Sequence, residues 1–155
     1  EPEEVRLTVD GQAAAVCPEK GFVCLEPGKG RHEIRLCLPM KPRRIYAHEQ
    51  IRQDAGCVAF ARGPLVYCLE GCDNPEPLWN LTADPDGEIR MLDPDGSLPD
   101  GIRKMAIPGH RRTDASDALY SGRRPVYEPQ ELTAIPYYAW ANREPRDMRV
   151  WVREG

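Results

Sequence analysis

The chain has 155 residues, 41% of them hydrophobic and 30% charged, a composition typical of a globular protein that can bury a core. Its net charge of −4 argues against a nucleic-acid or anionic-membrane partner, because either would require a basic face. There is no apolar run near the roughly 18 residues of a membrane span, and because residue 1 is Glu1 we expect a piece of a longer protein or a processed product.

The first third of the chain predicts short strands separated by turns. Apolar and polar residues alternate along 5–9, and the Asp10-Gly11 pair that follows favours a tight hairpin, because both turn positions accept positive φ. The apolar runs 22–25 and 34–38 predict a second hairpin around the glycine-rich turn between them. Residues 43–49 predict a further short strand.

The stretch GCVAFARGPLVYCLEG, residues 56–71, predicts two consecutive strands. Residues 57–61 alternate, and Gly63-Pro64 interrupts the pattern. Residues 65–69 are almost entirely apolar, which indicates a strand covered on both faces.

Three more strands are predicted at 102–107, 131–141 and 148–152, the last with Trp151 on the face opposite to its apolar residues. No window of about 11 residues carries a helical stripe. Many short strands punctuated by glycine and proline therefore predict an all-β fold with little helix, an antiparallel β-sandwich.

Six cysteines lie at positions 17, 24, 37, 57, 68 and 72. All are in or beside apolar segments, where a free cysteine behaves as a small hydrophobe. Buried reduced thiols are therefore the favoured interpretation, with disulfides and a metal site as alternatives. Reduced thiols in turn favour a cytoplasmic location.

Cys68 and Cys72 are the pair that most suggests chemistry. On a continuous strand they would lie roughly 13 Å apart, beyond the reach of a disulfide unless Glu70-Gly71 turns the chain. The sequence has no CxxC pair, and its three histidines are scattered without ligand spacing: His32, His48 and His110. Neither a zinc site nor a thiol activated by imidazole is indicated, and we interpret the stretch as a core strand that ends at Gly71.

Two loop regions carry opposite charge, acidic in 73–101 and basic in 103–124, and could lie side by side. Exposed ion pairs between such loops would each contribute only about 0–1 kcal/mol to the free energy of unfolding. The repeated Asp-Pro-Asp-Gly sequences at 84–87 and 93–96 are typical of type I turns; the alternative, a calcium loop, would need alternating oxygen ligands and a final Glu.

Aromatic side chains leave two interpretations open. In alternating strands they usually belong to the core, but exposed rings could instead stack on sugars. The residues concerned are Trp79, Tyr137, Tyr138, Trp140 and Trp151.

Two long motifs, GCVAFARGPLVYCLEGCDN (56–74) and LTAIPYYAWANREPRDMRVWV (132–152), resemble the C-terminal region of glycoside hydrolase family 127, the β-L-arabinofuranosidase-like proteins. Upstream, VRLTVDGQ, KGFVCLE and LCLPMKPRRIYAH fit the same region in the same order. The resemblance covers about Val5 to Val152. It implies a partial first β-sandwich over 1–50 and a second β-sandwich over 51–155.

The resemblance also implies a parent enzyme with an N-terminal (α/α)6 barrel, in which a retaining glycosidase uses a cysteine nucleophile beside a zinc site. Those residues belong to the barrel, which this sequence lacks. We therefore assign no catalytic, cofactor-binding or metal-binding residue to the chain, and expect zinc only in the absent catalytic domain.

The expected function is that of a non-catalytic accessory region that braces the catalytic barrel or mediates dimer contacts. Its expected partners are the parent's own N-terminal catalytic domain and a second copy, since a sandwich cut between strands leaves unpaired edges and apolar faces. The alternatives are a carbohydrate-binding module that uses surface aromatics and an independent thiol enzyme, which would need a reactive cysteine.

Overall fold

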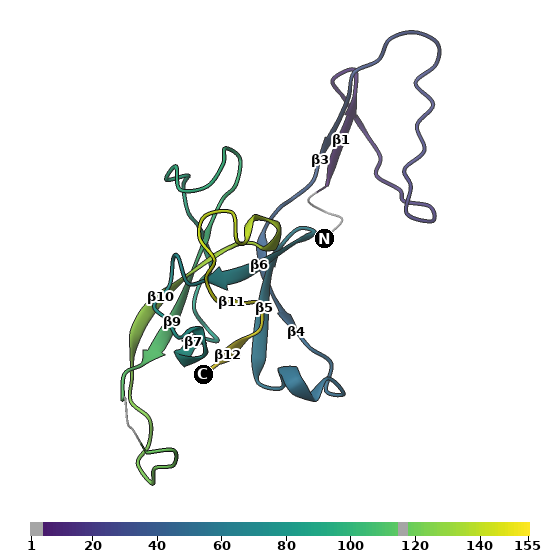
Figure 1. Ribbon diagram of the computed structural model, residues 1–155. Helices are drawn as coiled ribbons and strands as arrows, with labels where there is room; N and C mark the ends of the chain where they lie inside the picture. The colour runs from purple at the N-terminus through teal and green to yellow at the C-terminus, as the bar shows by residue number, and fades with distance from the viewer. Residues whose placement is uncertain (1–4, 115–117) are drawn as a thin grey trace. The chain divides into compact units, whose positions relative to one another are not determined.

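The structure is a computed structural model that describes residues 5–114 and 118–155. The chain divides into two compact units, Glu1–Lys41 and Pro42–Gly155 (Figure 1). The only helical segments in the described part are three 3-10 turns, namely η2 (Arg52–Asp54), η3 (Leu78–Asn80) and η4 (Tyr137–Ala139). The prediction of an all-β fold with little helix is confirmed. None of the described helical segments has the length and apolar character needed to cross a membrane.

The first unit contains a three-stranded antiparallel sheet in the order β2-β1-β3. Its strands are β1 (Arg6–Val9), β2 (Gln12–Ala14) and β3 (Ile34–Cys37). Asp10 and Gly11 have φ values of 50° and 80°, so the predicted hairpin turn between β1 and β2 is confirmed.

The prediction of a strand at 22–25 is wrong. Lys20 and Gly21 both have positive φ and close a tight turn, in which Glu19 and Phe22 exchange backbone hydrogen bonds of 2.8 and 3.0 Å. That turn leaves only an isolated bridge between Glu19 and Phe22, and β3 pairs with β1 instead.

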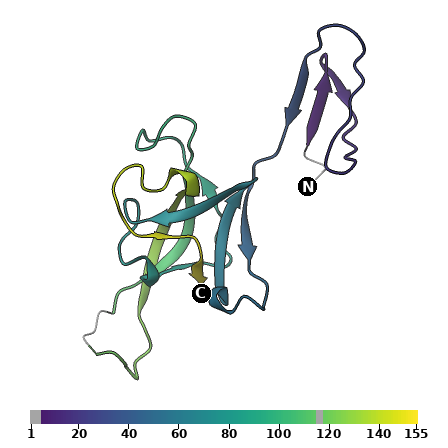
Figure 2. The same ribbon diagram turned by 45° about the vertical axis from the view of Figure 1, so that its right-hand side comes forward.

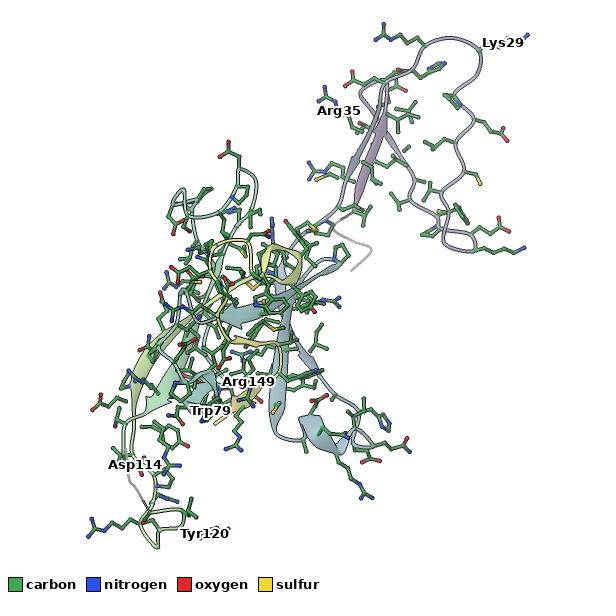
Figure 3. All side chains as sticks on the ribbon, in the orientation of Figure 1. Lys29, Arg35, Trp79, Asp114, Tyr120 and Arg149 are labelled. Atoms are coloured by element: carbon green, nitrogen blue, oxygen red, sulfur yellow. The ribbon has the colours of Figure 1, made fainter. Side chains whose placement is uncertain are left out.

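The three-stranded sheet has one apolar and one polar face. Leu7 lies directly opposite Leu36, and Val9 opposite Ile34, so these side chains share a face. Leu7 is buried, but Ile34 and Leu36 are 52% and 56% exposed. The other face carries Arg6, Thr8, Cys37 and Arg35, which Figure 3 labels on β3. We call the first of these the apolar sheet face and include Leu38, which is also 56% exposed.

The second unit contains a nine-stranded sheet in its described residues. Its strands are β4 (Pro42–Tyr46), β5 (Cys57–Arg62), β6 (Leu65–Glu70), β7 (Leu81–Ala83), β8 (Arg90–Met91), β9 (Met105–Arg112), β10 (Tyr127–Pro136), β11 (Met148–Arg149) and β12 (Val152–Glu154). They run in the order β11-β6-β10-β9-β7-β12-β5-β4, with β8 on β9. Because β5 also pairs with β6, the six strands β6-β10-β9-β7-β12-β5 close on themselves into a sandwich-like fold (Figure 2).

Pairing between strands explains two differences from the predicted organisation. β4 pairs with β5 along five residues, so it belongs to the second unit, and the units divide after Lys41 rather than at residue 50. The single strand predicted over 148–152 is two strands, because β11 pairs with β6 whereas β12 pairs with β5 and, in parallel, with β7.

The core has two parts on opposite faces of β6. Tyr67 and Leu69 belong to the larger cluster, together with Phe60 of β5 and Leu132 of β10. Cys68 faces the other way and packs in a smaller cluster: Leu98, Ile135 and Ala139. The prediction that β6 is covered on both faces is confirmed for Tyr67 to Leu69, which are each 1% exposed.

Candidate functional site

Cys68 is a packed core thiol. It is 1% exposed, and burial, reinforced by the neighbouring negative charge of Glu70, raises its pKa to about 12. A thiolate is the reactive form of cysteine, so at neutral pH this side chain remains protonated and inert. The interpretation of the stretch as a core strand that ends at Gly71 is confirmed.

The remaining cysteines correct the prediction of buried thiols. All six are free, but Cys17, Cys24 and Cys37 are exposed, and Cys57 and Cys72 are only half-buried. The exposed three lie in the first unit, where a single thin sheet covers few side chains.

The structure separates the histidines and satisfies the acidic turns locally. His32 contacts Asp10 at 2.7 Å, while His48 and His110 lie on other segments. In the first Asp-Pro-Asp-Gly sequence the Gly87 N–H donates to the Asp84 carbonyl at 3.3 Å, which confirms a turn. No three His, Cys, Asp or Glu side chains in residues 5–114 and 118–155 are placed to share a metal ion.

A buried ionic cluster at the end of β6 joins three segments far apart in sequence. Arg143 donates to Glu70 at 2.5 Å and forms two hydrogen bonds with Asp73, at 2.5 and 2.9 Å. Lys104 donates at 2.9 Å both to Asp73 and to Asp95. Glu70 is 0% exposed and Lys104 only 8%, so each of these two charges relies on its ionic partners rather than on water.

Asn74 completes this junction through backbone contacts. Its side-chain amide donates to the carbonyls of Glu70 and Thr133 and accepts from the Thr133 N–H, at 2.8–2.9 Å. The amide thereby ties the turn after β6 to β10. Asp73 and Asn74, which end the motif, therefore have a structural role.

This cluster was not predicted from the sequence. The signal that could have revealed it is Glu70, because strand alternation places it on the same face as Cys68, and a carboxylate on a covered face requires a cation. The sequence does not show which cation pairs with Glu70, because its partner Arg143 lies 73 positions away.

Acid should weaken the cluster in a defined pH range. Burial alone would raise the pKa of Asp73, but hydrogen bonds from Arg143 and Lys104 more than offset it and hold the pKa below its ordinary value of 3.8. A carboxyl with a lowered folded-state pKa stabilises the protein above its unfolded pKa, and that stability is lost as pH falls through the folded value.

We therefore expect the free energy of unfolding to fall as pH drops below about 4, and Asp73→Asn to reduce that slope. Urea denaturation from pH 6 to pH 2.5 tests this. An unchanged slope in the variant would contradict it.

Four of the aromatic side chains considered for sugar stacking lie at the surface, which contradicts their interpretation as core residues: Trp79, Tyr137, Tyr138 and Trp140, between 38% and 61% exposed. Tyr137 and Trp140 stack with ring centroids 6.3 Å apart and planes inclined by 28°. Trp140 also lines an open depression of about 400 Å³.

Comparisons with known proteins place these features in a family. The chain is 41% identical over 154 residues to a non-reducing end β-L-arabinofuranosidase of Bifidobacterium longum, which covers 95% of this chain but only 23% of that protein. A GH127 β-L-arabinofuranosidase from Geobacillus stearothermophilus T6 superposes with a TM-score of 0.79 at 33% identity, over 97% of this chain and 24% of that one. A GH127 β-arabinofuranosidase superposes with a TM-score of 0.78 at 28% identity, over 97% of this chain and 23% of that one.

These relatives agree with the resemblance of the two long motifs. The chain spans less than a quarter of the length of each of these three relatives. Residues 42–153, which include all of the second unit's strands but the last residue of β12, match the glycoside hydrolase family 127 C-terminal domain, and the chain belongs to that family.

Proposed function

We propose that this chain is the non-catalytic C-terminal accessory region of a glycosidase that resembles β-L-arabinofuranosidases. In this proposal, the bond-breaking residues, including the zinc site expected from the resemblance, lie in a catalytic domain outside the 155 residues. The free state of all six cysteines supports a reducing, cytoplasmic location.

The observation that carries the accessory role is the apolar sheet face. Ile34 and Leu36 share one face of β3 and, like Leu38 just after the strand, are each more than half exposed, in a unit whose described residues form a sheet of three strands. A contiguous exposed apolar surface typically marks a protein contact site. We propose that in a longer parent protein this face packs against the region before it and so braces the catalytic domain.

In the isolated chain the same face should bind a second copy. We expect sedimentation velocity to reveal a concentration-dependent dimer of the 17.5 kDa chain. Leu36→Lys should shift the equilibrium to monomer, because a buried ammonium without a partner is strongly unfavourable.

Thr8→Lys is the matched control, since it adds the same charge to the polar face of the same sheet. It should leave the dimer intact. A wild-type chain that stays monomeric at millimolar concentration, or equal loss of dimer in both variants, would contradict the proposed contact.

A further inference from the structure

The depression beside Trp140 combines features of a ligand site. Six residues line it: Glu76, Trp140, Ala141, Pro145, Arg146 and Asp147. They supply an aromatic ring, a guanidinium and two carboxylates around a volume of about 400 Å³. Small-molecule sites are concave surfaces of this size with an apolar wall and a few polar groups.

The apolar wall is a supported aromatic platform. Trp140 is 38% exposed and lines the depression, and Tyr137 stacks against it with a centroid distance of 6.3 Å. Tyr137 itself does not line the depression. An indole held in this way offers a fixed apolar surface at little cost in side-chain entropy.

The polar side of the depression retains hydrogen-bonding capacity. Arg146 lies 3.6 Å from Glu76 and donates to Glu144 at 3.1 Å. A guanidinium has five N–H donors and a carboxylate can accept about four hydrogen bonds, so both groups can also bind hydroxyls. The lining carries two carboxylates against one guanidinium, a net charge of −1 that disfavours an anion, so the ligand that fits it is neutral and rich in hydroxyls.

The loop that forms the depression is held in a strained conformation. Ala141 has φ of 61°, a left-handed value that is unfavourable for a residue with a Cβ. Its N–H donates to the buried Glu70 carboxylate at 3.0 Å, and Arg143, two residues on, binds the same carboxylate. Gly71 N–H fixes the far end of the loop through the Asp147 carbonyl at 3.0 Å.

Strain of this kind persists only where the surroundings impose it, and it concentrates at binding sites. The ionic cluster at the end of β6 thus holds the backbone next to Trp140 through the Ala141 N–H and Arg143.

We propose that this depression is a non-catalytic binding site for a neutral sugar unit of an oligosaccharide. The apolar C–H face of the sugar packs on Trp140, and its hydroxyls bind Glu76 and Arg146. The inference goes beyond the accessory role and rests on it only for the choice of an arabinose-containing probe.

The test is calorimetric titration of the full chain with a β-L-arabinofuranosyl oligosaccharide. We expect saturable binding with a dissociation constant on the order of 1 mM. Trp140→Ala should weaken it at least about tenfold, the equivalent of about 1.4 kcal/mol. Trp140→Phe, which keeps an aromatic platform, should bind within a few-fold of wild type, so the pair of variants separates a lost surface from a misfolded loop.

Trp79→Ala is the matched control, since Trp79 is a 61% exposed tryptophan on η3 that does not line the depression (Figure 3). It should leave affinity unchanged. No saturable binding by the wild type, or equal weakening by Trp79→Ala and Trp140→Ala, would overturn the site. Either result would leave the sedimentation behaviour of the apolar sheet face unaffected, so failure here is distinguishable from failure of the accessory role.

Discussion

Replacing Arg143 by alanine is expected to lower the free energy of unfolding by about 3–5 kcal/mol, the effect of removing one partner from a buried ion pair. The reason is Glu70, which is 0% exposed and would be left without its cation, while Asp73 would lose two hydrogen bonds. Urea denaturation at pH 7 measures the change.

Arg90→Ala is the matched control. Arg90 donates to Glu131 at 2.5 Å, but both side chains are more than half exposed, so water can replace the contact and the loss should stay within about 0–1 kcal/mol. Adding Glu70→Gln to an Arg143→Met variant should recover part of the stability, because the neutral amide can still accept from the Ala141 N–H. Equal losses for Arg143→Ala and Arg90→Ala would contradict a buried cluster.

Gly109→Ala should destabilise the second unit by at least about 1–3 kcal/mol, the usual range for overpacking. Gly109 lies within β9, where it pairs with Ala83 of β7 and Gln130 of β10. A Cβ there would lie 2.2 Å from the Thr82 carbonyl oxygen, a backbone atom that can move only if β7 shifts. Thermal unfolding followed by circular dichroism measures the effect.

Gly122→Ala provides the control within the same protein. Among the described residues, no atom lies within 4 Å of a methyl added at Gly122, and its φ is not positive. Alanine at such a position should be neutral or stabilise by about 0.4–1 kcal/mol, because it reduces the freedom of the unfolded chain. Similar destabilisation by both variants would mean that β7 and β9 do not approach each other this closely.

Local pattern predicted most of the strands. Asp10-Gly11 fixed the first hairpin because positive φ at both positions is a property of the two residues themselves. Alternation and apolar runs located β5 and β6, because these patterns are also properties of the local sequence. The run 22–25 had equal apolar character but formed no strand, since the Lys20-Gly21 turn and the pairing of β3 with β1 decide its path.

Long-range pairing was the part that the sequence could not reveal. β4 reads as an isolated strand, and only its register with β5 assigns it to the second unit. Likewise, 148–152 alternates like one strand, but Met148 and Val152 pair with different neighbours.

The candidate sites were predictable only in part. The inert Cys68 followed from its apolar neighbours, whereas the exposure of Trp140 did not follow from alternation, because η4 interrupts the strand after Pro136. The ionic cluster depends on contacts between residues about 70 positions apart.

In the function proposed above, glycosidic bond cleavage takes place outside these residues. The most direct measurement is hydrolysis of an aryl β-L-arabinofuranoside by the purified 155-residue chain, with a full-length GH127 β-L-arabinofuranosidase as positive control under the same conditions. We predict a rate equal to that of buffer alone. Turnover above the buffer rate that depends on the concentration of the chain would contradict the account.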